Sequence, residues 1–210
     1  MRLYEHPASG NCLKIRIALR QLGVAYESVT VDLFRGETRT REHFARNPDG
    51  RIPVLETGAG DTVAESGAIL LYLAEGTPLL PDGRLERARV HQWMFFEQNR
   101  IEADLSVARF WRLAGRDVAL PEAFANRVER GRDAVATLDR GLAGGRPFVA
   151  GDEYSVADIA LYGYVHCGAD AGVDPREYAA VAAWLDRVED TPGFANDLEP
   201  VPAHAAERPI

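Results

Sequence analysis

The chain has 210 residues, which is enough for one large domain or two small ones. Its composition, 46% hydrophobic and 27% charged residues, is that of an ordinary globular protein. The net charge of −8 argues against a surface that binds nucleic acid or an anionic membrane.

The first 75 residues predict an alternation of strands and helices, because short alternating or apolar runs are separated by helical periodicity and turn signals. In chain order, the predicted elements are a strand at 2–6, an amphipathic helix ending at Gly23, a strand at 26–31, a short irregular helix within 35–47, a hairpin of 54–56 and 62–64, and a helix at 66–74. The last helix is apolar nearly all round, so we expect it to be buried.

The composition changes at residues 76–83, a linker rich in proline and glycine. No convincing strand follows it, and helical patterns cover residues 85–113, 121–142, 159–165 and 181–188. Ser155 to Asp158 has the form of a helix capping box, with Asp in place of the usual Glu or Gln. The sequence therefore predicts an α/β domain at residues 1–76 and an all-helical domain at residues 84–210.

The cysteines and the N-terminus favour a cytoplasmic protein. Cys12 and Cys167 lie far apart in the sequence, so they form no disulfide framework and a reducing compartment is expected. The first seven residues have no apolar signal core, and no apolar run approaches the length of a membrane span.

Two motifs in the first domain indicate a site for a small peptide. In residues 51–54, Pro53 follows β-branched Ile52 before a short strand, which makes their peptide bond a candidate cis bond. The Ile52 N–H and C=O would then pair with an extended peptide. Glu65 and Ser66, at the start of the next helix, offer a carboxylate, a hydroxyl and backbone N–H groups to a charged amino-acid end.

Four motifs, in this order and spacing, resemble those of the cytosolic glutathione transferase family. They are Ser9–Leu19, similar to the first-helix signature of serine-type bacterial, theta and zeta members, then Asn47–Leu55, Glu65–Ile69 and Tyr154–Ala160, the last similar to the family's folding cap. The resemblance spans almost the whole chain. It implies a thioredoxin-like first domain, glutathione as co-substrate, usually a homodimer, and addition of the glutathione thiolate to an electrophilic small molecule.

The resemblance assigns thiolate activation to Ser9. Asn11 is expected as a second polar group near the sulfur, because a polar amide at the mouth of a helix needs a partner. A free thiol has a pKa of about 8.5 and is mostly protonated at neutral pH. A serine hydroxyl is too weak an acid to be a base, but it can donate a hydrogen bond to sulfur beside the positive end of a helix. The residues alone favour Ser9 as a helix cap. Cys12 is the alternative candidate for thiol chemistry, as a redox thiol. The competing interpretation of Cys12 is a small buried residue on the first helix.

The resemblance also distributes the glutathione contacts. The backbone of Ile52, oriented by Pro53, takes the cysteinyl part, while Glu65 takes the γ-glutamyl ammonium and Ser66 its carboxylate. Arg51 is expected either to meet the glycyl carboxylate or to be a solvated loop arginine. Further candidates for the glycyl end, none of them preferred, are Phe34, Arg39 and His43.

The electrophile pocket is expected along the long helix after the linker, with Arg109 and Trp111 as substrate contacts. The competing interpretation of this stretch is core packing together with solvated arginines. We expect the aromatic cluster at residues 93–96 to form core and subunit interface, and Asp158 to be a capping acid. No metal site is expected, because the five histidines are scattered and not paired at i, i+4.

Two other functions stay open. One is glutathione-dependent isomerisation or thiol–disulfide reduction on the same scaffold. The other is a non-catalytic glutathione-binding or protein-interaction module. The presence of Ser9, Ile52-Pro53 and Glu65-Ser66 together argues against the second, because a degenerate site would tend to lose one of these side chains.

Overall fold

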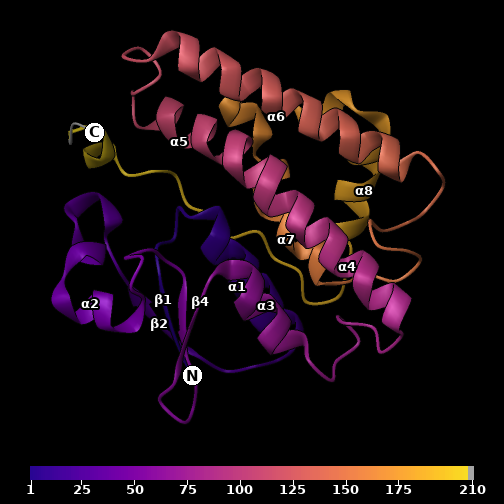
Figure 1. Ribbon diagram of the computed structural model, residues 1–210, viewed down its shortest axis with the longest axis horizontal. Coiled ribbons are helices and arrows are strands. Elements are labelled where there is room, and N and C mark those ends of the chain that lie inside the picture. The colour runs from indigo at the N-terminus through magenta and orange to yellow at the C-terminus, as the bar shows by residue number, and fades with distance from the viewer. Residues whose placement is uncertain (208–210) are drawn as a thin grey trace. The chain divides into compact units, whose positions relative to one another are not determined.

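The structure, a computed structural model, describes residues 1–207 and divides into two compact units (Figure 1). The first unit is Met1–Glu75 together with the chain from Pro192 onward, and the second is Gly76–Thr191. The sequence placed everything from residue 84 to the C-terminus in the helical domain. The structure differs for the C-terminal segment, because Asp197 pairs with Arg16 and Arg20 of the first unit.

The first unit contains a four-stranded mixed sheet with the strand order β2-β1-β3-β4. Its main elements are β1 (Arg2–Glu5), α1 (Gly10–Gln21), β2 (Glu27–Thr30), α2 (Arg41–Arg46), β3 (Val54–Glu56), β4 (Thr62–Ala64) and α3 (Ser66–Ala74). β1 is parallel to β2 and antiparallel to β3, and β3 and β4 form the predicted hairpin. The predicted thioredoxin-like arrangement is confirmed. The predicted irregular helix consists of two 3-10 turns, Leu33–Arg35 and Glu37–Arg39, followed by α2.

The sheet of the first unit lies between α2 on one side and the pair α1 and α3 on the other (Figure 1). Leu3 of β1 and Leu55 of β3 are register partners, and both are fully buried. The prediction that α3 is buried holds for one face of the helix and is wrong for the other. Ile69, Leu70 and Leu73 are buried, but Tyr72 is 46% exposed, because a helix packed against one neighbouring layer covers a single stripe of its surface.

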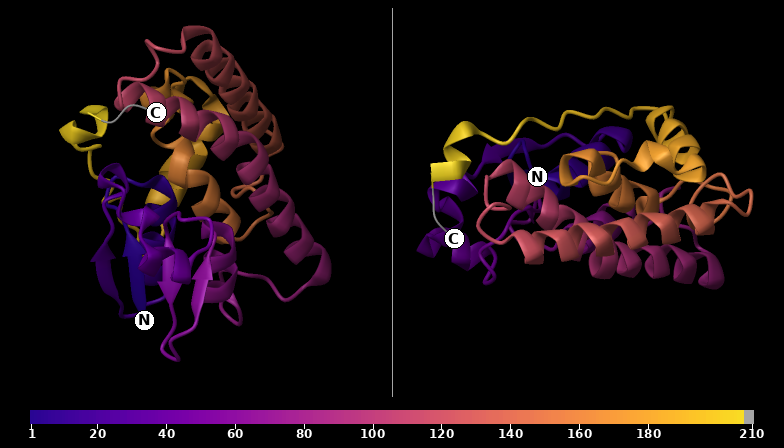
Figure 2. Two further views of the ribbon diagram at one scale, coloured as in Figure 1. Left: turned by 60° about the vertical axis from the view of Figure 1, so that its left-hand side comes forward. Right: turned by 90° about the horizontal axis from the view of Figure 1, so that it is seen from above.

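The second unit is helical throughout its regular structure. Its main elements are α4 (Arg84–Phe96), a π-helical segment (Glu97–Ser106), α5 (Val107–Leu113), α6 (Pro121–Leu142), α7 (Val156–Val165) and α8 (Ala179–Glu189). The first three run on from one another (Figure 2), as the long helical pattern at residues 85–113 predicts. α7 is almost entirely buried and contacts α4, the π-helical segment and α8.

The N-terminus of α7 is fixed by the predicted capping box. Asp158 is fully buried, and its carboxylate accepts hydrogen bonds from the Ser155 N–H at 3.0 Å, the Val149 N–H at 3.0 Å and the Trp184 indole N–H at 2.9 Å. The Ser155 hydroxyl, in turn, accepts from the Ala157 N–H. Asp158 therefore connects α7, α8 and the preceding loop, which is the structural role expected for it.

No helix among residues 1–207 is both long enough and apolar enough to cross a bilayer.

Candidate active site

Ser9 stands at the junction between β1 and α1. Its backbone is extended, with φ −87° and ψ 121°, and its Oγ accepts a hydrogen bond from the Cys12 N–H at 3.3 Å, so Ser9 is the N-cap of α1. The Ser9 N–H donates to the His6 carbonyl at 3.0 Å, which fixes the turn. Capping uses an oxygen lone pair and leaves the hydroxyl proton to donate elsewhere, so the two predicted roles of Ser9 are compatible.

Cys12 lies one turn into α1 and is fully buried. Burial is the largest influence on this thiol and raises its pKa to about 12. A thiol with that pKa is almost wholly protonated at neutral pH and is a poor nucleophile. The structure therefore favours the small buried residue over the redox thiol.

Asn11 and Ser66 lie 55 positions apart in the sequence and are in contact in the structure. The Ser66 hydroxyl donates to Oδ1 of Asn11 at 3.1 Å, and the Lys14 ammonium donates to the same oxygen at 2.7 Å. Ser66 is the first residue of α3 and Asn11 is in the first turn of α1. Two helix N-termini, each carrying a partial positive charge, thus meet at one polar contact.

The backbone at Ile52 is held by its neighbours. The Arg51 carbonyl accepts from the His43 imidazole Nε2 and from the Asn47 side-chain amide, each at 3.0 Å. The N–H and C=O of a trans peptide point in opposite directions, so the Ile52 N–H points away from His43 and Asn47. The Ile52–Pro53 bond is cis, as predicted.

A tight turn at residues 47–50 sets up this segment. The Gly50 N–H donates to the Asn47 carbonyl at 2.9 Å, and Gly50 has a φ of +65°. A Cβ at this position would come within 2.7 Å of the Phe44 ring. The Asn47-Pro48-Asp49-Gly50 signal in the sequence thus needs its glycine both for the backbone angle and for space.

Glu65 directly precedes α3 and has an unusual backbone. Its φ is 70° and its ψ 118°, and it is the one non-glycine residue with positive φ among the described residues. No side chain within residues 1–207 caps α3. The first N–H groups of α3 therefore lie beside an exposed carboxylate, an arrangement that can take both charges of an amino-acid end.

Arg51 forms an exposed ion pair with Asp49, with 2.7 Å between Nε and Oδ2. The other candidates for the glycyl end have partners within the first unit. Arg39 donates to the Asp49 carbonyl at 3.1 Å, His43 binds the Arg51 carbonyl, and the Phe34 ring stacks edge-on against His6 at 5.3 Å. The glycyl role of Arg51 stays a prediction.

Arg109 and Trp111 lie on α5 of the second unit. Arg109 is buried, and its guanidinium pairs with Asp170 at 2.9 Å. Trp111 is half-buried, and the Arg127 guanidinium lies 6.0 Å from its ring centre. These contacts belong to the helical unit, and the predicted substrate contacts of both residues stay predictions.

Three residues shape this site in ways that the sequence did not predict, although His43 was a candidate for the glycyl end. Lys14 supports Asn11, while His43 and Asn47 hold the Arg51 carbonyl. Asn47 belongs to a recognised turn motif, but that motif indicates only the turn. A lysine inside a helical pattern reads as a solvated side chain, so nothing in the sequence marked Lys14 as fully buried. Among residues 1–207, no cluster of His, Cys, Asp or Glu could hold a metal ion.

Comparisons with known proteins agree with this architecture. The family described as "Glutathione S-transferase, N-terminal domain" matches residues 1–75, and "Glutathione S-transferase, C-terminal domain" matches residues 121–187. Over 203 residues, the chain is 30% identical to the disulfide-bond oxidoreductase YfcG of Escherichia coli, covering 93% of each protein.

Two solved structures extend the likeness to the fold. A glutathione S-transferase from Pseudomonas fluorescens has a TM-score of 0.91 and 39% identity, covering 94% of this chain and 98% of that one. A glutathione transferase from Burkholderia graminis, solved with two glutathione molecules bound per subunit, has a TM-score of 0.81 and 28% identity, covering 91% of this chain and 84% of that one. The chain belongs to the glutathione S-transferase family.

Proposed function

We propose that this protein joins the thiolate of glutathione to electrophilic small molecules. The observation that carries the proposal is the 3.1 Å hydrogen bond between Ser66 and Asn11. This bond joins the first turns of α3 and α1, and these two helix ends supply the groups that the proposal needs for an amino-acid end and for a thiol. One tripeptide is long enough to span both, since an extended residue covers about 3.3 Å.

Glutathione binding then divides among residues of the first unit. The Glu65 carboxylate pairs with the γ-glutamyl ammonium, and the Ser66 hydroxyl and the first N–H groups of α3 take the carboxylate. The backbone of Ile52 pairs with the cysteinyl part in the manner of an added strand. The Arg51 side chain gives up its ion pair with Asp49 and binds the glycyl carboxylate.

The chemistry rests on Ser9 and the positive end of α1. The Ser9 hydroxyl donates to the sulfur and the helix dipole stabilises the negative charge, so a larger fraction of bound thiol is deprotonated at neutral pH. The proton leaves to solvent. The thiolate then attacks an electrophilic carbon, a C–S bond forms, and the electron pair goes to the leaving group or to the acceptor carbon, which takes a proton. Arg109 and Trp111 of α5 are the proposed substrate contacts.

The test compares wild type with Ser9→Ala and Ser9→Gly. Both variants lack the hydroxyl donor, but glycine costs only a few tenths of a kcal/mol as an N-cap while alanine costs about 1 kcal/mol. We expect both variants to raise the pKa of bound glutathione, which is measured from the absorbance of the thiolate. We also expect both to lower kcat roughly 10- to 1,000-fold with a chromogenic electrophile. A bound thiol whose pKa is the same in wild type and both variants would contradict the role of Ser9.

A second candidate function is reduction of disulfides, favoured by the 30% identity to a disulfide-bond oxidoreductase. One glutathione thiolate would attack a substrate disulfide and release one thiol, and a second glutathione would attack the mixed disulfide, yielding the second thiol and oxidised glutathione. Buried Cys12 takes no part in this scheme. Parallel assays with a small-molecule disulfide and with the electrophile distinguish the two functions. The substrate with the higher kcat/KM identifies the main activity.

We also propose a cytoplasmic homodimer. Both cysteines are free thiols, as suits a reducing compartment. Phe95 of α4 is 73% exposed and Tyr72 of α3 is 46% exposed, and apolar side chains this exposed are common where subunits meet. Light scattering should give twice the chain mass for wild type and a lower mass for Phe95→Asp. A wild-type monomer at micromolar concentration would refute the dimer.

A further inference from the structure

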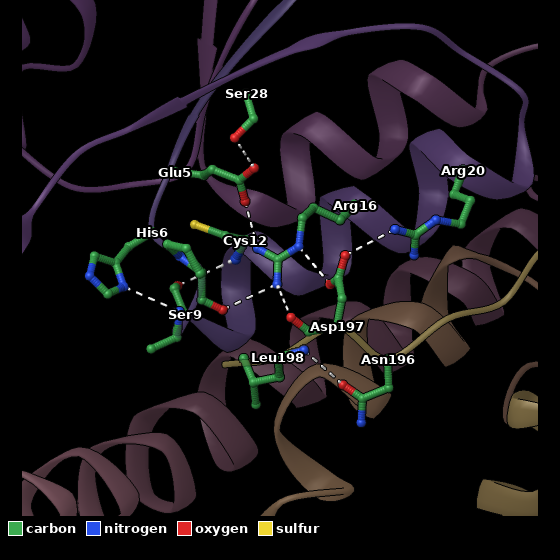
Figure 3. A network of polar contacts seen from close by, with 12 residues as sticks. Glu5, His6, Ser9, Cys12, Arg16, Arg20, Ser28, Asn196, Asp197 and Leu198 are labelled. Carbon is green, nitrogen blue, oxygen red and sulfur yellow. Dashed lines mark hydrogen bonds and ion pairs between the residues drawn. The ribbon is translucent and has the colours of Figure 1, made fainter. Parts of the chain in front are cut away.

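The C-terminal tail of the first unit, residues 195–199, packs against α1 and the loop before it (Figure 3). Asp197 accepts from the Arg16 guanidinium at 2.7 Å and from the Arg20 guanidinium at 2.9 Å. Arg20 also donates to the Ala195 carbonyl at 3.2 Å. Although burial opposes ionisation, the hydrogen bonds from Arg16 and Arg20 hold the pKa of Asp197 below its ordinary value. The tail is therefore fixed by a charged network.

Arg16 is the centre of this network. Its side chain is only 7% exposed, and its guanidinium also pairs with the buried carboxylate of Glu5 at the end of β1. The Ser28 hydroxyl donates to the other oxygen of Glu5 at 2.7 Å. A buried arginine has to be matched by acceptors, because an unmatched buried charge is strongly destabilising. Here the acceptors come from β1 on one side and from the tail on the other (Figure 3).

The network ends on the loop that carries Ser9. The Pro7 carbonyl accepts two hydrogen bonds, one from Nη2 of Arg16 at 3.2 Å and one from the Glu199 backbone N–H at 3.2 Å. Pro7 is two residues before Ser9, and the short turn between them is closed by the bond from the Ser9 N–H to the His6 carbonyl. The loop thus has an anchor on α1 and an anchor on the tail.

We propose that the tail braces the catalytic loop, and that Arg16 and Asp197 are positioning residues for the Ser9 hydroxyl. This inference rests on the proposed function of Ser9. Arg16 acts on the Ser9 loop through the Pro7 carbonyl, and Asp197 acts through Arg16. Ser66, Glu65 and Ile52 have no part in the network, so loosening the brace should affect activation of the thiol more than capture of glutathione.

The first pair of variants removes the tail's charge. Asp197→Ala deletes the acceptor for Arg16 and Arg20, whereas Asp197→Asn keeps one side-chain oxygen for Arg16. We expect Asp197→Ala to lower kcat roughly 10- to 100-fold, the scale for a catalytic group displaced by about 1 Å. KM for glutathione should stay within about twofold, since ground-state contacts are untouched. Asp197→Asn should recover most of the rate.

The second pair isolates the backbone donor. Glu199→Pro removes the N–H that binds the Pro7 carbonyl, while Glu199→Ala keeps it. Asp190→Ala, at an exposed position between α8 and the tail, is the control for substitution in this part of the chain. Melting temperatures identify folded variants, and hydrogen exchange of peptides covering residues 6–12 reports the loop without relying on activity.

Three readouts decide between the outcomes. A raised pKa of bound glutathione, faster exchange in residues 6–12 and a lower kcat in Asp197→Ala and Glu199→Pro would support the brace. Folded variants with wild-type values of all three would overturn it, even if Ser9→Ala raises the pKa. If Ser9→Ala itself leaves the pKa of the bound thiol unchanged, the proposed function of Ser9 fails, while loop exchange still tests the brace.

Discussion

The Ser66 hydroxyl donates a hydrogen bond to Oδ1 of Asn11, 3.1 Å away, and so links the first turns of α3 and α1. Ser66 is buried at this junction, with 4% of its surface exposed. Its hydroxyl oxygen can still accept, and the N–H groups of the first turn of α3 have no side-chain cap within residues 1–207. Under the proposed function, a glutathione carboxylate that binds here would complete this network.

Ser66→Ala tests the binding side of the site. We expect glutathione affinity to fall by roughly 1–3 kcal/mol, the range for leaving a charged group short of one hydrogen bond. Calorimetric titration with glutathione measures this directly. Thr137→Ala removes a hydroxyl that bonds within α6 and is the control. Unchanged affinity in Ser66→Ala would assign Ser66 to the helix junction alone.

Cys12 should resist alkylation. With a pKa near 12, its thiolate fraction at about pH 8 is roughly 1,000-fold lower than that of an ordinary thiol. Half-buried Cys167 provides a comparison in the same chain. Peptide mass spectrometry after iodoacetamide treatment should find Cys167 modified first and Cys12 modified only in denaturant. A glutathione adduct at Cys12 in the folded protein, with loss of turnover in Cys12→Ala, would contradict this and transfer the activating role away from Ser9.

Asp158→Ala should destabilise the second unit severely. The substitution leaves the Val149, Ser155 and Trp184 donors buried without their acceptor. At about 1 kcal/mol or more for each orphaned group, the loss reaches roughly 3 kcal/mol. All three tryptophans lie between Gly76 and Thr191, so urea unfolding followed by tryptophan fluorescence reports this unit. Exposed Asp152→Ala is the matched control, and equal midpoints for the two variants would refute the prediction.

His166 should make the second unit less stable in mild acid. Burial lowers the pKa of His166 to about 4, against about 6.5 in an unfolded chain. Between these values the unfolded state binds the extra proton, so stability rises with pH across this window and is lost as pH falls through it. The full difference amounts to about 3 kcal/mol.

The measurement for His166 is urea unfolding at about pH 5 and about pH 7 in wild type and His166→Gln. The variant should lose much of the dependence on pH, because glutamine takes up no proton in this range. His91→Gln, which removes a histidine from α4, is the matched substitution. A wild-type pH dependence in His166→Gln would show that other groups are responsible.

The sequence predicted those elements whose signals are local. The hairpin bounds agree with the structure because Gly58 to Asp61 form a glycine-rich turn between two short strands. The range of α3 agrees because Ser66 begins a stretch without charged side chains, which ends at Glu75 and Gly76. The Asn47–Gly50 turn and the Ser155–Asp158 cap were predictable for the same reason. Each consists of side chains that bond to their own neighbouring backbone.

What the sequence did not predict depends on distant partners. Arg16 is buried only because Glu5 and Asp197 meet it, and Asp197 lies 181 positions further along the chain. The tail around it is polar and proline-rich, without any periodicity that places it on α1. The positive φ of Glu65 is equally invisible in the sequence, because glutamate has no preference for that backbone region and tertiary contacts have to impose it.

The return of the tail to α1 sets an order of events during synthesis. The strands and helices of the first unit leave the ribosome before α4 to α8, and the tail leaves after them. In a nascent chain that has just completed α8, Glu5 is available to Arg16 but Asp197 is not. The first unit is therefore synthesised first but completes its folding last. Its Ser9 loop gains the contact with the tail only when the tail has left the ribosome.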